Sequence, residues 1–211
     1  MKSIKNQDSQ TKITAIKAWL GTGSINVFGM PFAGKDTQCD RLATLLSAAS
    51  FGGGDILRNS TVTQELKTAI DGGSLAPTEE YRAIVLPYFN RPEFVGKPLV
   101  LSSVGRWIGE EEAVLEAAKK SGHPIMAVIV LSLSEAHAVE RLEMADRGRD
   151  DDHMEKLHTR FNEFETKTQP VLEVYAAKHL LVSVSGEQSM DEVTEAIITN
   201  LYSFIQETAQ A

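Results

Sequence analysis

The stretch from Ile25 to about Ser50 constrains the fold of this chain more than any other part of the sequence. Ile25-Asn-Val-Phe28 is a short run of bulky apolar residues between turn residues, which predicts a buried strand. Next comes Gly29-Met-Pro-Phe-Ala-Gly34-Lys35, which fits the spacing G-x-x-x-x-G-K, and then a segment with helical spacing. A strand, a glycine-rich turn and a helix in this order can cradle phosphate, because backbone N–H groups point at the anion and glycines let the backbone approach it. We expect Lys35 to neutralise bound phosphate groups; the competing explanation is a chance glycine-rich turn.

The rest of the chain alternates between apolar runs and helical patterns. Further buried strands are expected at 98–101, 124–133 and 180–184. Helices are expected at about 13–20, 36–50, 55–70, 77–87, 110–120, 134–142, 153–178 with a kink near Pro170, and 191–207. This alternation predicts an α/β fold, a parallel sheet with helices on both faces. The charged stretch 143–153 has almost no apolar content and is expected to form an exposed lid or loop.

Composition narrows the classes of function. The 211 residues carry 21 Lys and Arg against 29 Asp and Glu, a formal net charge of −8. This balance argues against a nucleic-acid or anionic-membrane binder, which shows a basic patch, but it allows a small phosphorylated ligand. No apolar run approaches the ~20 residues of a membrane span, and the N-terminus lacks the apolar core of a signal peptide. Because Cys39 is the one cysteine, no internal disulfide can form, and we expect a cytoplasmic protein.

Several motifs, in order along the chain, resemble the adenylate kinase and nucleoside monophosphate kinase family. The opening INVFGMPFAGKDTQ resembles the family's glycine-rich signature, in which a threonine follows the lysine by two positions. Further matches are Gly54-Asp-Ile-Leu-Arg58, the segment 73–77, Arg106, the segment 148–152 with Arg160, and the segment 167–171 with Tyr175. The resemblance spans about residues 25–199, and over this range the chain is similar to a divergent, short-lid member of the family.

This resemblance implies a P-loop core with a five-stranded parallel sheet, flanked by helices. It also implies an NMP-binding helical segment at about 52–88 and a short lid at about 143–152. Residues 1–24 would be an N-terminal extension with a short helix, which either packs on the core or mediates association, and 25–211 the kinase domain. A monomer is expected, with ATP and nucleoside monophosphates as ligands.

The reaction implied by the resemblance is reversible transfer of the terminal phosphoryl group from Mg·ATP to a nucleoside monophosphate, with AMP as the first candidate acceptor. An acceptor with another base (GMP, CMP or UMP), another P-loop small-molecule kinase, and a nucleotide-binding protein that has lost catalysis are the alternatives.

The resemblance also assigns site residues. Phosphoryl transfer needs positioning and charge stabilisation, so cations should converge on one point. The catalytic candidates are Lys35, Arg58, Arg106, Arg149 and Arg160. The ATP-binding candidates are Gly29, Pro31, Ala33, Gly34, Lys35, Asp36, Thr37 and Arg141. The acceptor-binding candidates are Gly54, Asp55, Arg58, Arg106 and Glu110, and Asp55 would also face Mg²⁺ through water.

Three positions depart from the family pattern. Ser102 stands where the family has an acid at the end of a strand, which normally orients magnesium-bound water. Asp36 stands where the family has a glycine after the lysine, and we hypothesise that it restores the missing charge on the metal side. Glu110 stands where a glutamine reads the acceptor adenine. A carboxylate only accepts hydrogen bonds, so it would suit guanine; alternatively, it belongs to a solvated acidic run.

Overall fold

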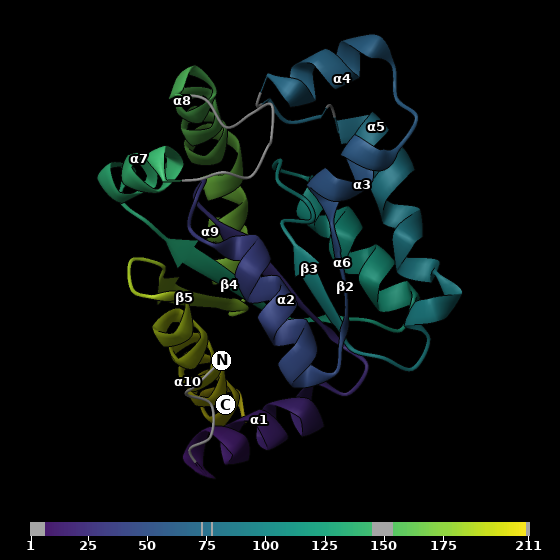
Figure 1. Ribbon diagram of the computed structural model, residues 1–211. Helices are drawn as coiled ribbons and strands as arrows, with labels where there is room; N and C mark the ends of the chain where they lie inside the picture. Colours follow the sequence, from purple (N-terminus) through teal and green to yellow (C-terminus); the bar gives the residue numbers. More distant parts are fainter. Residues whose placement is uncertain (1–6, 73, 77, 145–153, 210–211) are drawn as a thin grey trace.

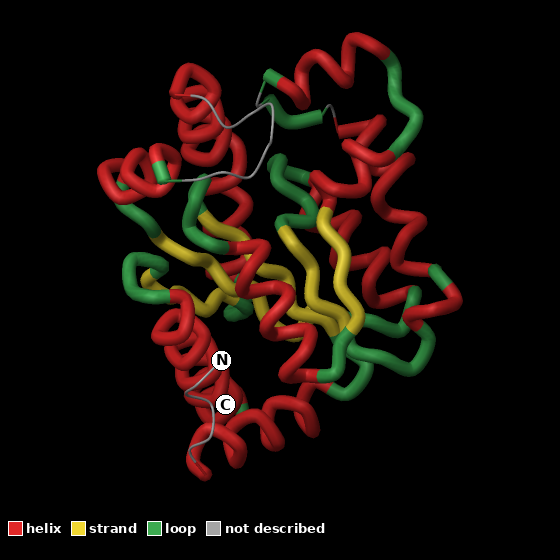
Figure 2. Tube along the Cα trace, in the orientation of Figure 1, coloured by secondary structure: helices red, strands yellow, loops and turns green. Residues whose placement is uncertain are grey.

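The computed structural model describes residues 7–72, 74–76, 78–144 and 154–209. Its centre is a five-stranded sheet in the order β2-β3-β1-β4-β5, in which every strand pair is parallel (Figures 1 and 2). The strands are β1 (Ser24–Gly29), β2 (Ala49–Gly52), β3 (Leu99–Ser102), β4 (Ile125–Ser132) and β5 (Leu181–Ser185). This arrangement confirms the predicted α/β fold.

Helices cover both faces of the sheet in the described part of the chain. They are α1 (Gln7–Leu20), α2 (Lys35–Leu46), α3 (Gly53–Asn59), α4 (Gln64–Asp71), α5 (Thr78–Val85), α6 (Glu110–Lys120), α7 (Glu135–Glu143), α8 (Met154–Glu163), α9 (Gln169–Ala177) and α10 (Met190–Thr208). Two short 3₁₀ turns, η1 (Leu86–Asn90) and η2 (Pro92–Phe94), lead into β3, and a π-helical turn, η3 (Phe164–Thr168), joins α8 to α9.

The core has two halves because neighbouring strand residues point to opposite faces. Ile25 and Val27 of β1 join one apolar cluster, which includes residues of α1, α2 and α10. Phe28 of the same strand joins the other cluster, with residues of α3, α5, α6 and α9. All six residues of β1 are buried, as expected for the central strand of a covered parallel sheet.

Helix α1 packs on this core. Its buried residues Ile13, Ile16 and Leu20 belong to the first cluster, and Ser9 Oγ donates a hydrogen bond of 3.0 Å to Glu195 on α10. Among the described residues, no helix is both long and apolar enough to cross a membrane.

Three expectations about local structure need correction. Strand β2 was not predicted, because its four residues include a serine and a glycine and show no apolar run. The helix expected at 55–70 was wrong as one piece, since α3 ends at Asn59 and α4 begins at Gln64. The helix expected at 153–178 with a kink near Pro170 is divided into α8 and α9 by the π-helical turn η3, which ends at Thr168; Pro170 lies at the start of α9, where its missing N–H is tolerated. Most of the expected lid, and Arg149 with it, lies outside the described residues.

Candidate active site

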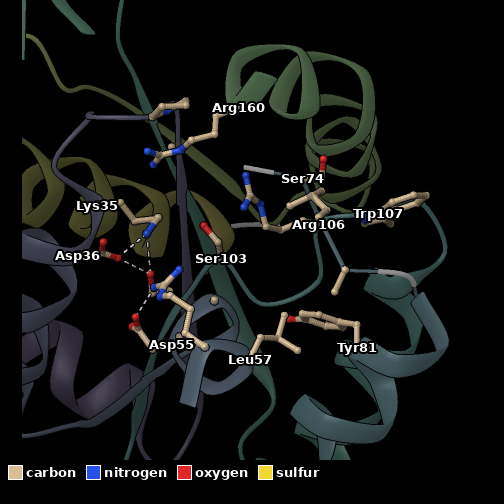
Figure 3. Close-up of a pocket in the computed structure, with 18 of the residues that line it drawn as sticks. Lys35, Asp36, Asp55, Leu57, Ser74, Tyr81, Ser103, Arg106, Trp107 and Arg160 are labelled. Carbon is tan, nitrogen blue, oxygen red and sulfur yellow. Dashed lines mark hydrogen bonds and ion pairs between the residues drawn. The ribbon is translucent and has the colours of Figure 1, made fainter. Parts of the chain in front are cut away.

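A pocket opens where β1 and β3 end, which is the edge where parallel α/β sheets bind ligands. Helices α2, α3 and α8 and the loop after β3 all contribute side chains to it (Figure 3). Its lining includes ten of the residues predicted from sequence: Gly29, Pro31, Lys35, Asp36, Gly54, Asp55, Arg58, Arg106, Glu110 and Arg160. The structure therefore brings together most of the predicted site.

The loop between β1 and α2 has a shape that depends on glycine. A Cβ at Gly29 would lie 3.1 Å from the Leu131 Cβ atom on β4, so glycine lets the loop pass β4 without displacing that strand. Gly34 has φ = +83°, a left-handed conformation that glycine adopts freely, and it is the N-cap of α2. The backbone turns through Gly34 so that α2 begins at Lys35 with its N-terminus facing the pocket.

Arg141 supports this loop from α7. Its guanidinium donates to the Phe32 carbonyl at 3.1 Å and to the Gly186 carbonyl at 2.8 Å. The side chain therefore ties the loop to the turn between β5 and α10. Arg141, Ala33, Gly34 and Thr37 are absent from the described lining of the pocket.

Lys35, Asp36 and Ser102 form a connected polar group at the strand ends. Lys35 Nζ donates to Ser102 Oγ at 2.8 Å and also pairs with the Asp36 carboxylate. Ser102 Oγ in turn donates to Asp36 Oδ1 at 2.8 Å. Ser102, at the end of β3, thus holds an acid that comes from the neighbouring helix α2.

A second ion pair lies on α3. Arg58 Nη2 donates to Asp55 Oδ1 at 2.5 Å, three residues apart on the same helix. Both side chains are substantially exposed, with 37% of Arg58 and 62% of Asp55 accessible to solvent. A pair in this environment contributes little stability, so Arg58 can turn to another anion at low cost.

In the loop that carries Arg106, four successive backbone N–H groups donate hydrogen bonds to side chains. Val104 N–H donates to the Asn26 side chain at 3.2 Å, and Gly105 N–H donates to the Tyr81 hydroxyl oxygen at 2.8 Å. The next two amides, of Arg106 and Trp107, both donate to Glu110 Oε2, at 2.8 and 3.1 Å. The Asn26 amide also donates to the Val104 carbonyl at 2.7 Å. This clamp, formed by Asn26, Tyr81 and Glu110, fixes the backbone from which Arg106 projects.

Arg106 and Arg160 bring two positive charges into the pocket from different elements (Figure 3). Burial, and after it the charge of Arg160, lowers the pKa of the Arg106 guanidinium to about 10. Arg106 stays protonated at neutral pH, and its buried Nε has no hydrogen-bond partner within the described part of the chain. The Arg160 guanidinium lies 5.4 Å from the ring centre of Phe32. An anion bound between the two arginines would reduce the repulsion between their charges and could accept a hydrogen bond from Arg106 Nε.

The pocket lining also includes less polar side chains, among them Leu57, Ala76, Tyr81 and Trp107. The backbone next to Ala76 is tied to α8, since Leu75 N–H donates to Glu163 Oε2 at 3.2 Å. Aromatic and aliphatic side chains beside cationic ones suit a ligand with a ring and a phosphate.

Sequence reasoning missed three residues that position this site: Asn26, Tyr81 and Glu163. Asn26 gave a signal, because a buried polar side chain inside an apolar strand must find hydrogen-bond partners. Tyr81 and Glu163 gave none, since their partners are backbone groups far away in the sequence.

Comparisons with known proteins agree with this geometry. The family model described as adenylate kinase matches residues 27–180. An adenylate kinase of Parasynechococcus marenigrum (strain WH8102) is 32% identical over 174 residues, which is 80% of this chain and 93% of the relative. An adenylate kinase of Deinococcus deserti is 30% identical over 191 residues, covering 82% of this chain and 93% of the relative. An adenylate kinase of Stenotrophomonas maltophilia (strain K279a) is 28% identical over 179 residues, which is 82% of this chain and 95% of the relative.

Proposed function

We propose that this chain, which belongs to the adenylate kinase family, transfers the terminal phosphoryl group of ATP to AMP in the pocket at the ends of β1 and β3. The observation that carries the proposal is the convergence of Lys35, Arg106 and Arg160 on one pocket from three separate elements. The buried, unpartnered Nε of Arg106 within the described residues adds a site for an anionic ligand.

In this proposal the glycine-rich loop and Lys35 bind the donor phosphates. Arg58 and Arg106 bind the acceptor phosphate, and Arg160 lies between the two nucleotides, with Arg149 as a further candidate. Charge in the transition state spreads over the oxygens of the transferring group, so fixed cations on several sides stabilise it. Arginine suits the acceptor side because its planar fork grips phosphate oxygens in pairs. The clamp keeps Arg106 in place before the substrate arrives.

Mg²⁺ is the proposed metal, and the residues present fit it. The Asp36 and Asp55 carboxylates line the pocket beside Ser102. The described residues include no group of three or more His, Cys, Asp or Glu side chains that could hold a metal by themselves. That suits Mg²⁺, which keeps several waters and binds through one or two carboxylates and substrate phosphates. When bound, Mg²⁺ neutralises phosphate charge in the transition state.

The position of Glu110 favours AMP over GMP. One of its oxygens already accepts two backbone N–H groups, and the side chain is 1% exposed. A carboxylate used in this way holds the Arg106 loop, whereas guanine recognition would need both oxygens turned to the base. We further propose a monomer that works in the cytoplasm, in line with the single buried cysteine, Cys39.

The test is ADP formation from ATP with AMP, GMP, CMP or UMP, in the presence of Mg²⁺. We expect turnover with AMP to exceed that with the other acceptors at least about tenfold, which equals ~1.4 kcal/mol of discrimination. Faster turnover with GMP would overturn the choice of acceptor. ATP binding without turnover of any acceptor would instead favour a nucleotide-binding protein that has lost catalysis.

A further inference from the structure

Two acids from different helices face the metal side of the pocket. Asp36 lies in the first turn of α2 and Asp55 in the first turn of α3, and both line the pocket together with Ser102. The same three residues also line an adjoining groove between α2 and α3. The two acids therefore border the same pocket (Figure 3).

Each acid is paired with a cation that the proposed function assigns to phosphate. Asp36 pairs with Lys35, and Asp55 pairs with Arg58. The Asp36 side chain is 55% exposed and that of Asp55 is 62% exposed. The Arg58 side chain is 37% exposed and that of Lys35 is 21% exposed, so both pairs reach solvent on the side of the acid. A triphosphate, which carries more negative charge than one carboxylate, can therefore draw either cation away.

Besides Lys35, Ser102 also holds Asp36 in place. Its hydroxyl donates to the Asp36 carboxylate at 2.8 Å and accepts from Lys35 at 2.8 Å. When Lys35 turns to a phosphate, the bond from Ser102 still holds the carboxylate at the strand end. Asp36 then carries a negative charge beside the phosphates, which is unfavourable unless a cation lies between them.

We propose that Asp36 is the metal-positioning acid of this chain, held by Ser102 and paired with Lys35 until the nucleotide arrives. In the complex it would face Mg²⁺ through water beside Asp55, since Mg²⁺ retains most of its hydration shell. Asp36 then repels metal-free ATP and favours Mg·ATP, so it selects the metal-bound donor. This inference rests on the proposed function and adds that the Asp36 carboxylate couples the binding of Mg²⁺ to the binding of ATP.

The test is calorimetric binding of ATP to the full chain, once with excess Mg²⁺ and once with EDTA. The central variant is Asp36→Asn, which keeps the size of the side chain and removes its charge. A second variant, Asp36→Gly with Ser102→Asp, moves the carboxylate from the helix to the strand end. Glu116→Gln is the control, because Glu116 is an exposed acid on α6 that, like Asp36, pairs with a lysine and lies outside the pocket lining.

The wild type should bind Mg·ATP more tightly than metal-free ATP. In Asp36→Asn, metal-free ATP should bind about threefold to tenfold more tightly, and the ratio between the two affinities should fall about tenfold. The double variant should recover most of that ratio, and Glu116→Gln should keep the wild-type ratio. A purely structural role for Asp36 would not strengthen metal-free binding.

An unchanged affinity ratio in Asp36→Asn, with the wild-type unfolding temperature retained, would overturn this inference. Turnover of ATP and AMP by the wild type then shows whether the role of Asp36 or the proposed function itself has failed. If the wild type makes ADP, the proposed function stands and only the role of Asp36 is wrong. If the wild type makes no ADP with any acceptor, the proposed function fails, while the affinity ratio still decides whether Asp36 selects Mg·ATP.

Discussion

The loops that follow β1 and β3 face the same pocket and each presents a cation, yet the chain holds them in opposite ways. The first loop, before Lys35, takes its shape from glycines and from a close approach to β4. The second loop, before Arg106, takes its shape from three side chains that accept its backbone N–H groups. The first loop is therefore encoded mainly by adjacent residues, with support from Arg141. The second depends on Asn26 and Tyr81, which are distant in the chain, and on Glu110, four residues after Arg106.

This contrast has a functional consequence. In the proposed reaction the first loop serves the donor and the second the acceptor. Changes to the glycine loop should impair ATP binding alone, and changes to the clamp should impair AMP binding alone. The variants below test that separation, from the largest expected effect to the smallest.

Replacing Lys35 with methionine should have the largest effect. The change removes the cation from the donor loop but keeps a long side chain. We expect kcat to fall at least about a hundredfold, as when one preorganised group that stabilises transition-state charge is lost. Steady-state turnover of ATP and AMP measures this. Lys120→Met, at an exposed position on α6, is the control, and equal losses in both variants would refute a specific role for Lys35.

The clamp comes next, through Glu110. Glu110→Ala removes the acceptor of two backbone N–H groups, so Arg106 should lose its fixed position. We expect kcat/KM for AMP to fall about tenfold to thirtyfold, corresponding to ~1–2 kcal/mol for lost buried hydrogen bonds. Glu110→Gln keeps an acceptor oxygen and should retain most activity with the same preference for AMP. If Glu110→Gln instead changes the preferred acceptor, Glu110 reads the base.

The glycine loop can be tested without removing any charge. Gly34→Ala places a Cβ where φ is +83° but where no atom lies within 4 Å, so it adds backbone strain of about 1–2 kcal/mol without a collision. The ATP dissociation constant should rise about fivefold to tenfold, and AMP binding should stay unchanged. Gly96→Ala is the matched control, since Gly96 has φ = +75° with the same open surroundings. Equal effects of both variants on ATP binding would contradict the account.

The smallest effect is expected from Tyr81→Phe, which removes only the hydroxyl oxygen that accepts from Gly105 N–H. The KM for AMP should rise about threefold, which equals ~0.7 kcal/mol and lies within the range for one buried hydrogen bond, while the KM for ATP stays constant. Tyr202→Phe on α10 controls for the loss of a hydroxyl elsewhere. A rise in the KM for ATP of the same size would show that the two loops are not independent.

The same contrast explains how much could be predicted from sequence. The donor loop was identified because its glycines, Lys35 and the flanking strand are adjacent in the sequence. Strand β4 was expected at 124–133 and is found at Ile125–Ser132, since its apolar run is long and continuous. The predicted cations Arg58, Arg106 and Arg160 line one pocket, in agreement with the motif order.

What could not be predicted depends on contacts across the fold. Strand β2 forms by pairing with β3 at the edge of the sheet, and its own residues carry no strand pattern. The role of Tyr81 in the clamp follows from a tertiary hydrogen bond to the Gly105 backbone, which leaves no periodic signal. Glu110 accepts from backbone amides only three and four residues before it, a local contact that the acidic run did not indicate. The prediction that Arg141 binds ATP stays a prediction, and no sequence pattern indicated the bonds that its guanidinium donates to the Phe32 and Gly186 carbonyls. We propose that these bonds support the donor loop.

The central claim is that donor and acceptor nucleotides meet in one pocket between Lys35 and Arg106. The most direct measurement is calorimetric binding of a bisubstrate analogue, in which two adenosines are joined by a chain of phosphates. The account predicts that one analogue binds per chain and that it excludes both ATP and AMP. It also predicts weaker binding of the analogue to Lys35→Met and to Arg106→Lys. Binding of the analogue that leaves AMP binding undisturbed would contradict the claim.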